Sequence, residues 1–373
     1  MRVLQIAPPW FPVPPTGYGG TEQVVSLLAD GLARRGHDVT LLAAGGSHSE
    51  ARLLTTYSQP PSPQLGNPTI ELAHVLAGYH ERDAFDVVHD HTMLGAAVGS
   101  VPGGPPVVHT LHGAWTPDAV RLYGRIQARV HLVAISHDQA GRAPPGVRIA
   151  SVVHNGIDVG AHRLVTGAGG YLAFVGRANA QKGPRDAIEV ARRLGWPLKM
   201  AVKVNEPNEH DYFATYLAPA VRRGEVEIVP VDSHEAKVEL LGGAAALLFP
   251  ITWPEPFGLV PVEANACGTP VVAFAEGAMP EVIEPGRSGL LVPTGDLDAF
   301  CGAVERAVHL DRPTCRRVVA DRFDAERMVA GYEQIFQRLV AGRGDAELPG
   351  GVTVTLPEVT PAETTGSELS GRP

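Results

Sequence analysis

The stretch "MRVLQIAPPWFPVPPTGYGGTEQVVSLLADGLARRGHDVTLLAA", residues 1–44, decides the fold. Its apolar run "RVLQIA" is typical of a buried strand, and a second such run, "DVTLLAA", closes the stretch. Between them lies a helical pattern whose apolar positions fall on one face: Val24, Leu27, Leu28, Gly31 and Leu32. A strand, a helix and a strand in this order form a βαβ unit and therefore predict a parallel sheet.

The same alternation continues along the chain and then starts again. Further strand-like runs are "FDVVHDH", "PVVHTLHG", "VHLVAIS" and "IASVVHNGID", and after a glycine-rich stretch come "YLAFVG", "LKMAVK", "VEIVP", "ALLFP", "PVVAF" and "GLLV". We predict two doubly wound, Rossmann-like α/β domains, residues 1–165 and 166–322, with a cleft between the carboxyl ends of their strands. A helix at 323–341 is expected to pack back on the first domain, and the Gly-, Pro- and Glu-rich segment 342–373 to be disordered.

Composition and charge restrict the function. The chain has 373 residues and a formal net charge of -9, which gives no electrostatic footprint for nucleic acid. The cysteines, Cys267, Cys301 and Cys315, show no CxxC spacing, so neither a disulfide framework nor a zinc site is indicated. No run of 18 apolar residues and no signal-peptide pattern is found, and we predict a cytoplasmic protein without a membrane segment.

The loop after the first strand is unusually long. It places five prolines between Pro8 and Pro15 and carries the aromatic residues Trp10, Phe11 and Tyr18 before it reaches Gly19 and Gly20. A strand-to-helix connection ordinarily takes two to six residues, so a stiff detour of this length indicates a binding site. Alternatively, Trp10 and Phe11 cover the top of the first domain's core.

The densest chemistry lies in "FPITWPEPFGLVPVEANACGTPVVAF", residues 249–274. Glu255 and Glu263 are expected at the amino end of one helix, where the amides of Phe257, Gly258 and Leu259 point outward. Such amides suit phosphate or hydroxyl oxygens, and carboxylates accept bonds from vicinal diols. A sugar nucleotide offers all of these groups. The alternative is that the two glutamates only complement the helix dipole.

A second cluster, "VGRANAQKGPRDAI", places Arg177 and Lys182 between a strand and a helix. Arginine can bond two phosphate oxygens at once and lysine adds a point charge, so the pair is typical of a diphosphate clamp. A solvated surface pair is the alternative.

Together these motifs resemble the retaining glycosyltransferases of family 4. The resemblance rests on the E-x7-E spacing of Glu255 and Glu263, the G-R-x4-K-G element at residues 176–183, the "HNGID" junction and "GYGGTE". It covers the chain up to about residue 340 and implies the GT-B fold. The segments "PPWFPVPPTGYGGTE", "VVHDHT" and "AVKVNEPNEHDYF" further resemble an actinobacterial branch close to enzymes that decorate oligosaccharide antibiotics.

The resemblance implies a role for each matching residue. Glu263 would bind the ribose hydroxyls, and Glu255 with the neighbouring amides would hold the donor sugar. Arg177 and Lys182 match the catalytic cations on the diphosphate. Two further elements come from the first domain: Gly19 and Gly20, whose amides approach the diphosphate, and His112, which lines the reaction centre.

Lys203 departs from the family pattern, in which many relatives have a glycine-rich turn. We expect it near the phosphates or beside an acidic sugar. The segment "VPVDSHEAK" is expected to contact the base, but it does not separate UDP from GDP or ADP.

Two patterns imitate metal motifs. Asp296 and Asp298 spell D-x-D, but their place before a helix favours N-capping. His89 and His91 should point to one face of a strand while Asp90 points away, and the sequence identifies no third ligand. We predict no metal.

The sequence thus predicts a metal-independent retaining glycosyltransferase. It would move a sugar from a nucleotide diphosphate sugar, its substrate, to a hydroxyl of a sugar, glycolipid or small-molecule acceptor, with no cofactor. The loop residues Trp10, Phe11 and Tyr18 are assigned to the acceptor. The alternatives are a GT-B sugar-nucleotide epimerase and a non-catalytic nucleotide-sugar-binding protein. A nicotinamide dehydrogenase is disfavoured because G-x-G-x-x-G does not follow the first strand.

Overall fold

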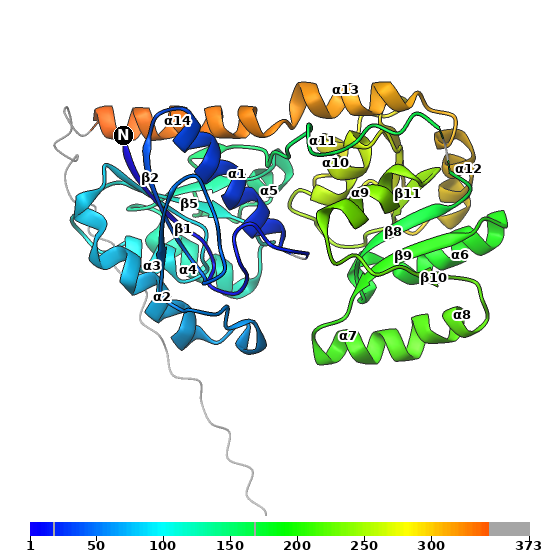
Figure 1. Ribbon diagram of the computed structural model, residues 1–373, viewed down its shortest axis with the longest axis horizontal. Helices are drawn as coiled ribbons and strands as arrows, with labels where there is room; N and C mark the ends of the chain where they lie inside the picture. Colours follow the sequence, from blue (N-terminus) through cyan, green and yellow to red (C-terminus); the bar gives the residue numbers. More distant parts are fainter. Residues whose placement is uncertain (18, 168, 343–373) are drawn as a thin grey trace, which may run out of the picture.

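The computed structural model describes residues 1–17, 19–167 and 169–342, which form two α/β lobes lying side by side (Figure 1). Each lobe is built on one parallel sheet, so the predicted pair of doubly wound sheets is confirmed. Tyr18 and residues 343–373 of the predicted disordered tail lie outside the described residues.

The first sheet has seven strands in the order β3-β2-β1-β4-β5-β6-β7. The strands are β1 (Arg2–Ile6), β2 (Asp38–Ala43), β3 (Arg52–Thr55), β4 (Val87–Asp90), β5 (Val107–Leu111), β6 (His131–Ala134) and β7 (Ser151–Val152). The order runs outward from β1 in both directions, so β1 and β4 meet where the winding reverses. The sequence pattern missed β3, because this short edge strand is exposed at its ends and only half-buried in its middle.

Helices cover both faces of the first sheet. They are α1 (Gly20–Arg34), α2 (Pro68–His80), α3 (Gly95–Gly99), α4 (Pro117–Ile126) and α5 (His137–Gly141), with short 3₁₀ helices η1 (Ser62–Gln64) and η2 (Arg82–Ala84). Successive strand residues point to opposite faces. In β1, Val3 joins the core beneath α1, whereas Leu4 joins the core beneath α2 and α4.

The second sheet has six strands in the order β10-β9-β8-β11-β12-β13. The strands are β8 (Leu172–Arg177), β9 (Leu198–Lys203), β10 (Glu227–Ile228), β11 (Ala246–Phe249), β12 (Val271–Phe274) and β13 (Gly289–Val292). All named pairings in this sheet are parallel, and the winding reverses between β8 and β11. The carboxyl ends of β8 and β11 therefore flank the crevice in which such sheets bind ligands.

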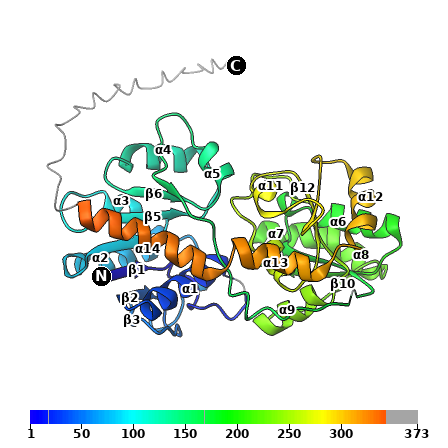
Figure 2. The same cartoon turned by 90° about the horizontal axis from the view of Figure 1, so that it is seen from above.

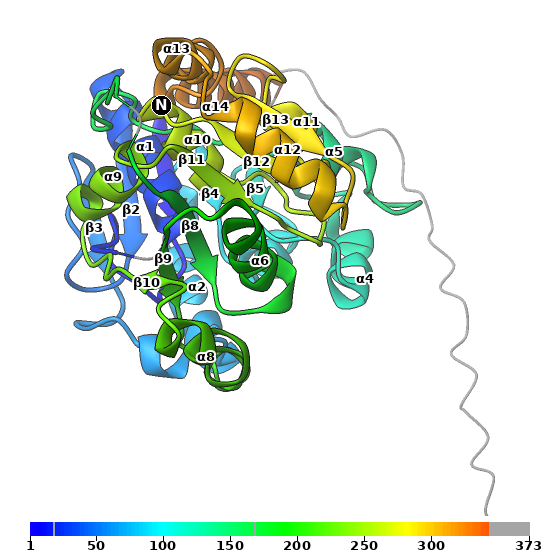
Figure 3. The same cartoon turned by 90° about the vertical axis from the view of Figure 1, so that its right-hand side faces the viewer.

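The helices of the second lobe again form two layers (Figure 3). They are η3 (Ala180–Lys182), α6 (Pro184–Leu194), α7 (Pro207–Tyr212), the π-helix η4 (Phe213–Leu217), α8 (Ala218–Arg222), α9 (His234–Gly242), α10 (Leu259–Ala266), α11 (Met279–Val282), α12 (Leu297–Ala307) and α13 (Arg312–Arg322). The core on one face includes α9, α10 and α11, and that on the other includes α6 and α12.

The last described helix, α14 (Ala325–Ala341), continues from α13 and crosses to the first lobe (Figure 2). Its residues Val329, Tyr332 and Phe336 are buried in the core that α1 shares with the first sheet. A Cβ atom at Gly31 of α1 would lie 2.5 Å from the Val329 side chain, so glycine permits this close helix contact. Both lobes are thereby joined by two connections, the chain between β7 and β8 and the α13–α14 crossing.

Within the described residues, no helix combines the length and the apolar character needed to cross a membrane.

Candidate active site

Arg177 and Lys182 lie on the loop that leaves β8. Arg177 is the last residue of the strand, and Lys182 ends η3. The Asn179 side chain accepts a hydrogen bond from the Lys182 amide at 3.0 Å, which fixes the turn. At Gly183, with φ +70°, a Cβ atom would lie 2.0 Å from the Pro250 carbonyl oxygen. Only glycine fits there, and the loop holds both cations at the carboxyl edge of the sheet.

Glu255 is paired with Lys182. The Lys182 ammonium donates to Oε2 of Glu255, and Nε1 of Trp253 donates to the same oxygen at 2.7 Å. The Thr252 amide also donates to the Gln181 carbonyl at 2.9 Å, so the two loops are held together. The sequence treats Lys182 and Glu255 as separate contacts to diphosphate and sugar, whereas the structure joins them in one ion pair.

The amino end of α10 points into the same region. Gly258, at φ +89°, caps a helix that begins at Leu259. The Phe257 ring is buried against Phe323, with the ring centroids 5.6 Å apart. The expectation that both acids stand at this helix end is corrected: Glu255 precedes the helix, and Glu263 lies in its second turn.

The first lobe contributes a second helix end. Gly19 caps α1 at φ +152°, and a Cβ atom there would lie 2.7 Å from Cβ of Pro15. Gly20 is the first residue of α1, and its Cβ would lie 3.2 Å from a methyl group of Leu259. The amino ends of α1 and α10 therefore approach one another across the lobes, and their unpaired amides suit an anion between them.

These groups surround a cavity of about 280 Å³ between the lobes. Its walls include Gly20, Thr21 and His112 from the first lobe and Gly176, Arg177, Lys182, Trp253, Glu255, Gly258 and Leu259 from the second. Burial lowers the pKa of His112 to about 4, so its ring is neutral near pH 7. The catalytic residues predicted from the sequence thus share one cavity. We call it the reaction cavity.

Glu263 lines a neighbouring cavity of about 340 Å³, which shares Gly20 and Leu259 with the reaction cavity. Nζ of Lys237 donates to Oε1 of Glu263 at 2.6 Å, while Oε2, also buried, has no partner within the described residues. Burial raises the pKa of Glu263, but the opposing effects of Lys237 and of the neighbouring His162 and His234 together bring the net pKa below the usual value. Ile228 to Val231 form an apolar wall, and Val229, Pro230 and Val231 belong to the segment expected to contact the base. We call this space the nucleoside cavity.

Lys203 lies beside Arg177, because their strands pair in register there. It lines the nucleoside cavity, and burial together with the nearby Arg177 charge lowers its pKa. The carboxylates of Glu206 and Glu209 lie 3.7 and 3.8 Å from the Arg177 guanidinium. The position that departs from the family pattern thus adds a cation beside Arg177.

A third cavity, of about 510 Å³, opens between the proline loop and α2. Its walls include Trp10, Phe11, Glu22, Leu65, Glu71, His91 and Met93. Trp10 is only 7% exposed, so most of its ring belongs to the lobe's interior and only an edge reaches the cavity. Phe11 is half-buried and is the better candidate for a ligand contact. We call this space the outer cavity.

The two sequence patterns that imitate metal motifs have other roles in the structure. Asp296 caps α12, with its side chain accepting from the Ala299 amide at 2.8 Å, as predicted. The His89 and His91 rings share one face, with centroids 4.0 Å apart, while Asp90 accepts bonds from Thr92 instead.

A different group, His137, His154 and Glu281, places three ligand atoms within 4.8 Å of one another. This group lies outside the reaction cavity. The Glu281 carboxylate of the second lobe accepts a hydrogen bond from the His137 amide of the first lobe at 2.8 Å, and this contact joins the lobes. Metal independence of the reaction stays a prediction.

The sequence analysis assigned no role to several residues that line the site. Lys237 lies in the segment "VPVDSHEAK", and Trp253 is the tryptophan of W-P-E-P-F-G, but neither position stood out by itself. Glu22 is 5% exposed, and burial raises its pKa to about 7. Its place after Gly19-Gly20, at the start of a helix in the cleft, is the signal that could have revealed it.

Two doubly wound lobes with facing helix ends and an anion-suited cavity between them define the GT-B class of glycosyltransferases. Family comparison agrees: residues 18–161 match the model "Glycosyltransferase Family 4", and residues 168–321 match "Glycosyl transferases group 1". The chain belongs to the family 4 glycosyltransferases.

Individual proteins of this kind are similar over most of the chain. A D-inositol 3-phosphate glycosyltransferase of Mycobacteroides abscessus is 29% identical over 343 residues, covering 77% of this chain and 76% of that protein. AviGT4, a glycosyltransferase of avilamycin A biosynthesis, superposes with a TM-score of 0.69 at 24% identity, covering 92% of this chain and 98% of its own. HepE of Anabaena, solved with UDP-glucose, gives 0.72 at 18% identity, covering 91% and 100%. These two structures establish a shared fold.

Proposed function

We propose that this glycosyltransferase transfers a sugar from a nucleoside diphosphate sugar to an acceptor hydroxyl with retention of configuration and without a metal ion. The observation that carries the proposal is the convergence of Arg177, Lys182 and two helix amino ends on one cavity between the lobes. This arrangement supplies positive charge and amide donors where a diphosphate leaving group needs them.

The cavities suggest how the donor lies. The nucleoside would occupy the nucleoside cavity, with the ribose diol on the unpartnered Oε2 of Glu263. The diphosphate would lie between the amino end of α1 and Arg177, and the sugar beside Glu255 in the reaction cavity. The complex of HepE with UDP-glucose supports this class of donor for the shared fold.

Lys182 is placed to act on both parts of the donor. Its ammonium is held by Glu255, which would contact the sugar, and its place at the end of η3 in the cavity wall would bring it beside the departing phosphate. Negative charge grows on the departing phosphate as the sugar–phosphate bond breaks, so fixed cations stabilise the transition state more than the ground state. The acceptor oxygen would attack from the same face, and its proton would pass to the departing phosphate oxygen.

The acceptor would enter from the outer cavity, which adjoins the reaction cavity at Gly20 and Arg177. The wall formed by Phe11, Leu65 and Met93 suits an apolar face, and the carboxylates of Glu22 and Glu71 suit hydroxyl groups. Tyr18, assigned to the same role from the sequence, lies outside the described residues.

The test begins with a panel of UDP-, GDP- and ADP-sugars screened by thermal shift. A ligand at about 100 times its dissociation constant adds about 2.7 kcal/mol to the folded state, which is readily measured. Stabilising donors are then assayed for hydrolysis and transfer, with NMR of the anomeric proton in the product. An inverted product, or activity lost in EDTA and restored by Mg²⁺ or Mn²⁺, contradicts the mechanism. Release of a rearranged sugar without acceptor would indicate the epimerase.

A further inference from the structure

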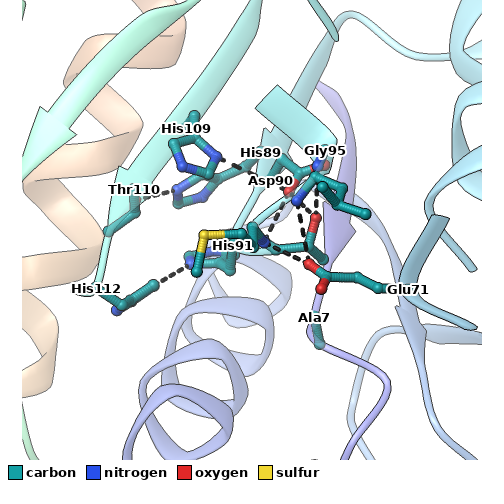
Figure 4. A network of polar contacts seen from close by, with 12 residues as sticks. Ala7, Glu71, His89, Asp90, His91, Gly95, His109, Thr110 and His112 are labelled. Carbon is teal, nitrogen blue, oxygen red and sulfur yellow. Dashed lines mark hydrogen bonds and ion pairs between the residues drawn. The ribbon is translucent and has the colours of Figure 1, made fainter. Parts of the chain in front are cut away.

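Two histidines, His91 and His112, line the outer cavity and the reaction cavity respectively, and Figure 4 shows the contact between their rings. His91 follows β4 and lines the outer cavity, whereas His112 follows β5 and lines the reaction cavity. Nδ1 of His91 lies 2.9 Å from Nε2 of His112. One hydrogen atom must occupy this contact, so one ring donates and the other accepts.

The orientation of the Gln5 amide sets which ring donates. Gln5 lies on β1, is fully buried, and places Oε1 3.2 Å from Nε2 of His91, while its own Nε2 is buried without a partner within the described residues. The reverse orientation of this amide would reverse both histidine contacts. An amide oxygen can only accept, so Nε2 of His91 carries a hydrogen, and in a neutral ring Nδ1 is then an acceptor. With Oε1 of Gln5 toward His91, His112 donates from Nε2. In a neutral His112 ring this leaves the lone pair on Nδ1.

Neighbouring groups hold the pair in place. The His91 ring lies against the His89 ring, and Nε2 of His89 is 2.8 Å from Oγ1 of Thr110. That hydroxyl lies 2.8 Å from the Tyr332 hydroxyl on α14, so the support reaches the helix that crosses between the lobes. Burial lowers the pKa of both His91 and His112, and the rings are neutral near pH 7.

Nδ1 of His112 is left for a ligand. Within the described residues it makes no hydrogen bond, and it is not among the buried polar atoms that lack a partner. Because His112 lines the reaction cavity, this nitrogen is accessible from that cavity. A lone pair there can accept a hydrogen bond from a hydroxyl group but cannot donate one to a phosphate or carbonyl oxygen.

We propose that His91 is a positioning residue that, with Gln5, holds His112 so that its Nδ1 lone pair accepts a hydrogen bond from a hydroxyl group of a bound sugar. The inference rests on the proposed function for the identity of the ligand. It specifies the direction of one hydrogen bond in the reaction cavity: a substrate must present a hydroxyl hydrogen to Nδ1 of His112.

The first test is ¹⁵N NMR of the histidine rings in the wild-type protein, with the His112 signals assigned from His112→Gln. We expect the hydrogen of His112 on Nε2. In Gln5→Met, which removes the amide oxygen at similar side-chain length, the preference should weaken, and the signals should shift toward the other tautomer. A hydrogen on Nδ1 of His112 in the wild type overturns the proposal.

The second test uses kinetics with two matched variants. His91→Phe keeps an aromatic ring against His89 but removes the acceptor, whereas the side-chain oxygen of His91→Asn lies as many bonds from the backbone as Nδ1. We expect kcat to fall about tenfold or more in His91→Phe and to recover most of the loss in His91→Asn. Equal kcat for the wild type and both variants overturns the proposal.

The readouts also locate the hydroxyl. A fall in donor hydrolysis without acceptor indicates a hydroxyl of the donor sugar, and a fall in transfer alone indicates the acceptor. A wild type without turnover on any donor refutes the proposed function, while the NMR measurement still decides the direction of the hydrogen-bond chain. If His91→Phe does not fold, the NMR measurements on the wild type and on Gln5→Met decide it.

Discussion

Replacing Glu263 by Gln separates the two acids of the E-x7-E motif. In the structure Oε1 of Glu263 is taken by Lys237 at 2.6 Å, and the buried Oε2 has no partner within the described residues. We therefore expect Oε2 to accept bonds from the ribose diol of a nucleoside diphosphate. Glutamine retains the shape and one acceptor oxygen but loses the charge.

The magnitude follows from hydrogen-bond energetics. A hydrogen bond to a charged group is worth about 1.5–3 kcal/mol and one between neutral groups about 0.5–1.5 kcal/mol. The difference of about 1–2 kcal/mol corresponds to a loss of about 5–30-fold in affinity. Glu255→Gln should leave the affinity for the bare nucleoside diphosphate within about twofold, because Glu255 lines the reaction cavity and not the nucleoside cavity.

The assay is titration calorimetry with UDP, GDP and ADP on both variants. Since Glu263→Gln also removes the ion pair with Lys237, melting curves without ligand must first show that the variant is folded at the temperature of the titration. Equal losses for the two variants, or a larger loss for Glu255→Gln, would refute the assigned roles.

Further predictions address the catalytic cation, the proline loop and a buried acid. Lys182→Ala should lower kcat about 100-fold, measured with saturating donor, and an unchanged kcat would exclude it from leaving-group stabilisation. Trp10→Ala should lower the free energy of unfolding by about 3 kcal/mol, because Trp10 is only 7% exposed. Phe11→Ala should instead raise the acceptor KM without changing Tm. If Trp10→Ala raises the acceptor KM and Phe11→Ala lowers Tm, Trp10 is the residue that contacts the acceptor. Burial raises the pKa of Asp90 from 3.8 to about 7, so its stabilising effect is complete below pH 3.8 and is lost as pH rises through 7. Asp90→Asn should flatten that decline, by up to about 4 kcal/mol between about pH 4 and 8, and parallel stability–pH curves for the two proteins would contradict this pKa.

The sequence was sufficient to predict the two parallel sheets, because apolar runs and helical periodicity are local properties. It also predicted where charge lies at the ends of β8 and β11, since Arg177 ends a recognisable strand and Lys182 and Glu255 each follow one. The edge strand β3 was missed because it buries too little to leave an apolar run.

Only the tertiary structure decided which of these groups meet. Lys182 and Glu255 form an ion pair, and Glu263 is paired with Lys237 in a separate cavity. The contact between His91 and His112 joins two strand ends that are 21 residues apart in the chain. Such contacts depend on strand order and on how the loops and helices at the strand ends pack within each lobe. A sequence pattern records the residue types of a segment, but long-range neighbours and burial are set by packing across the whole fold, and with them hydrogen-bond direction and pKa.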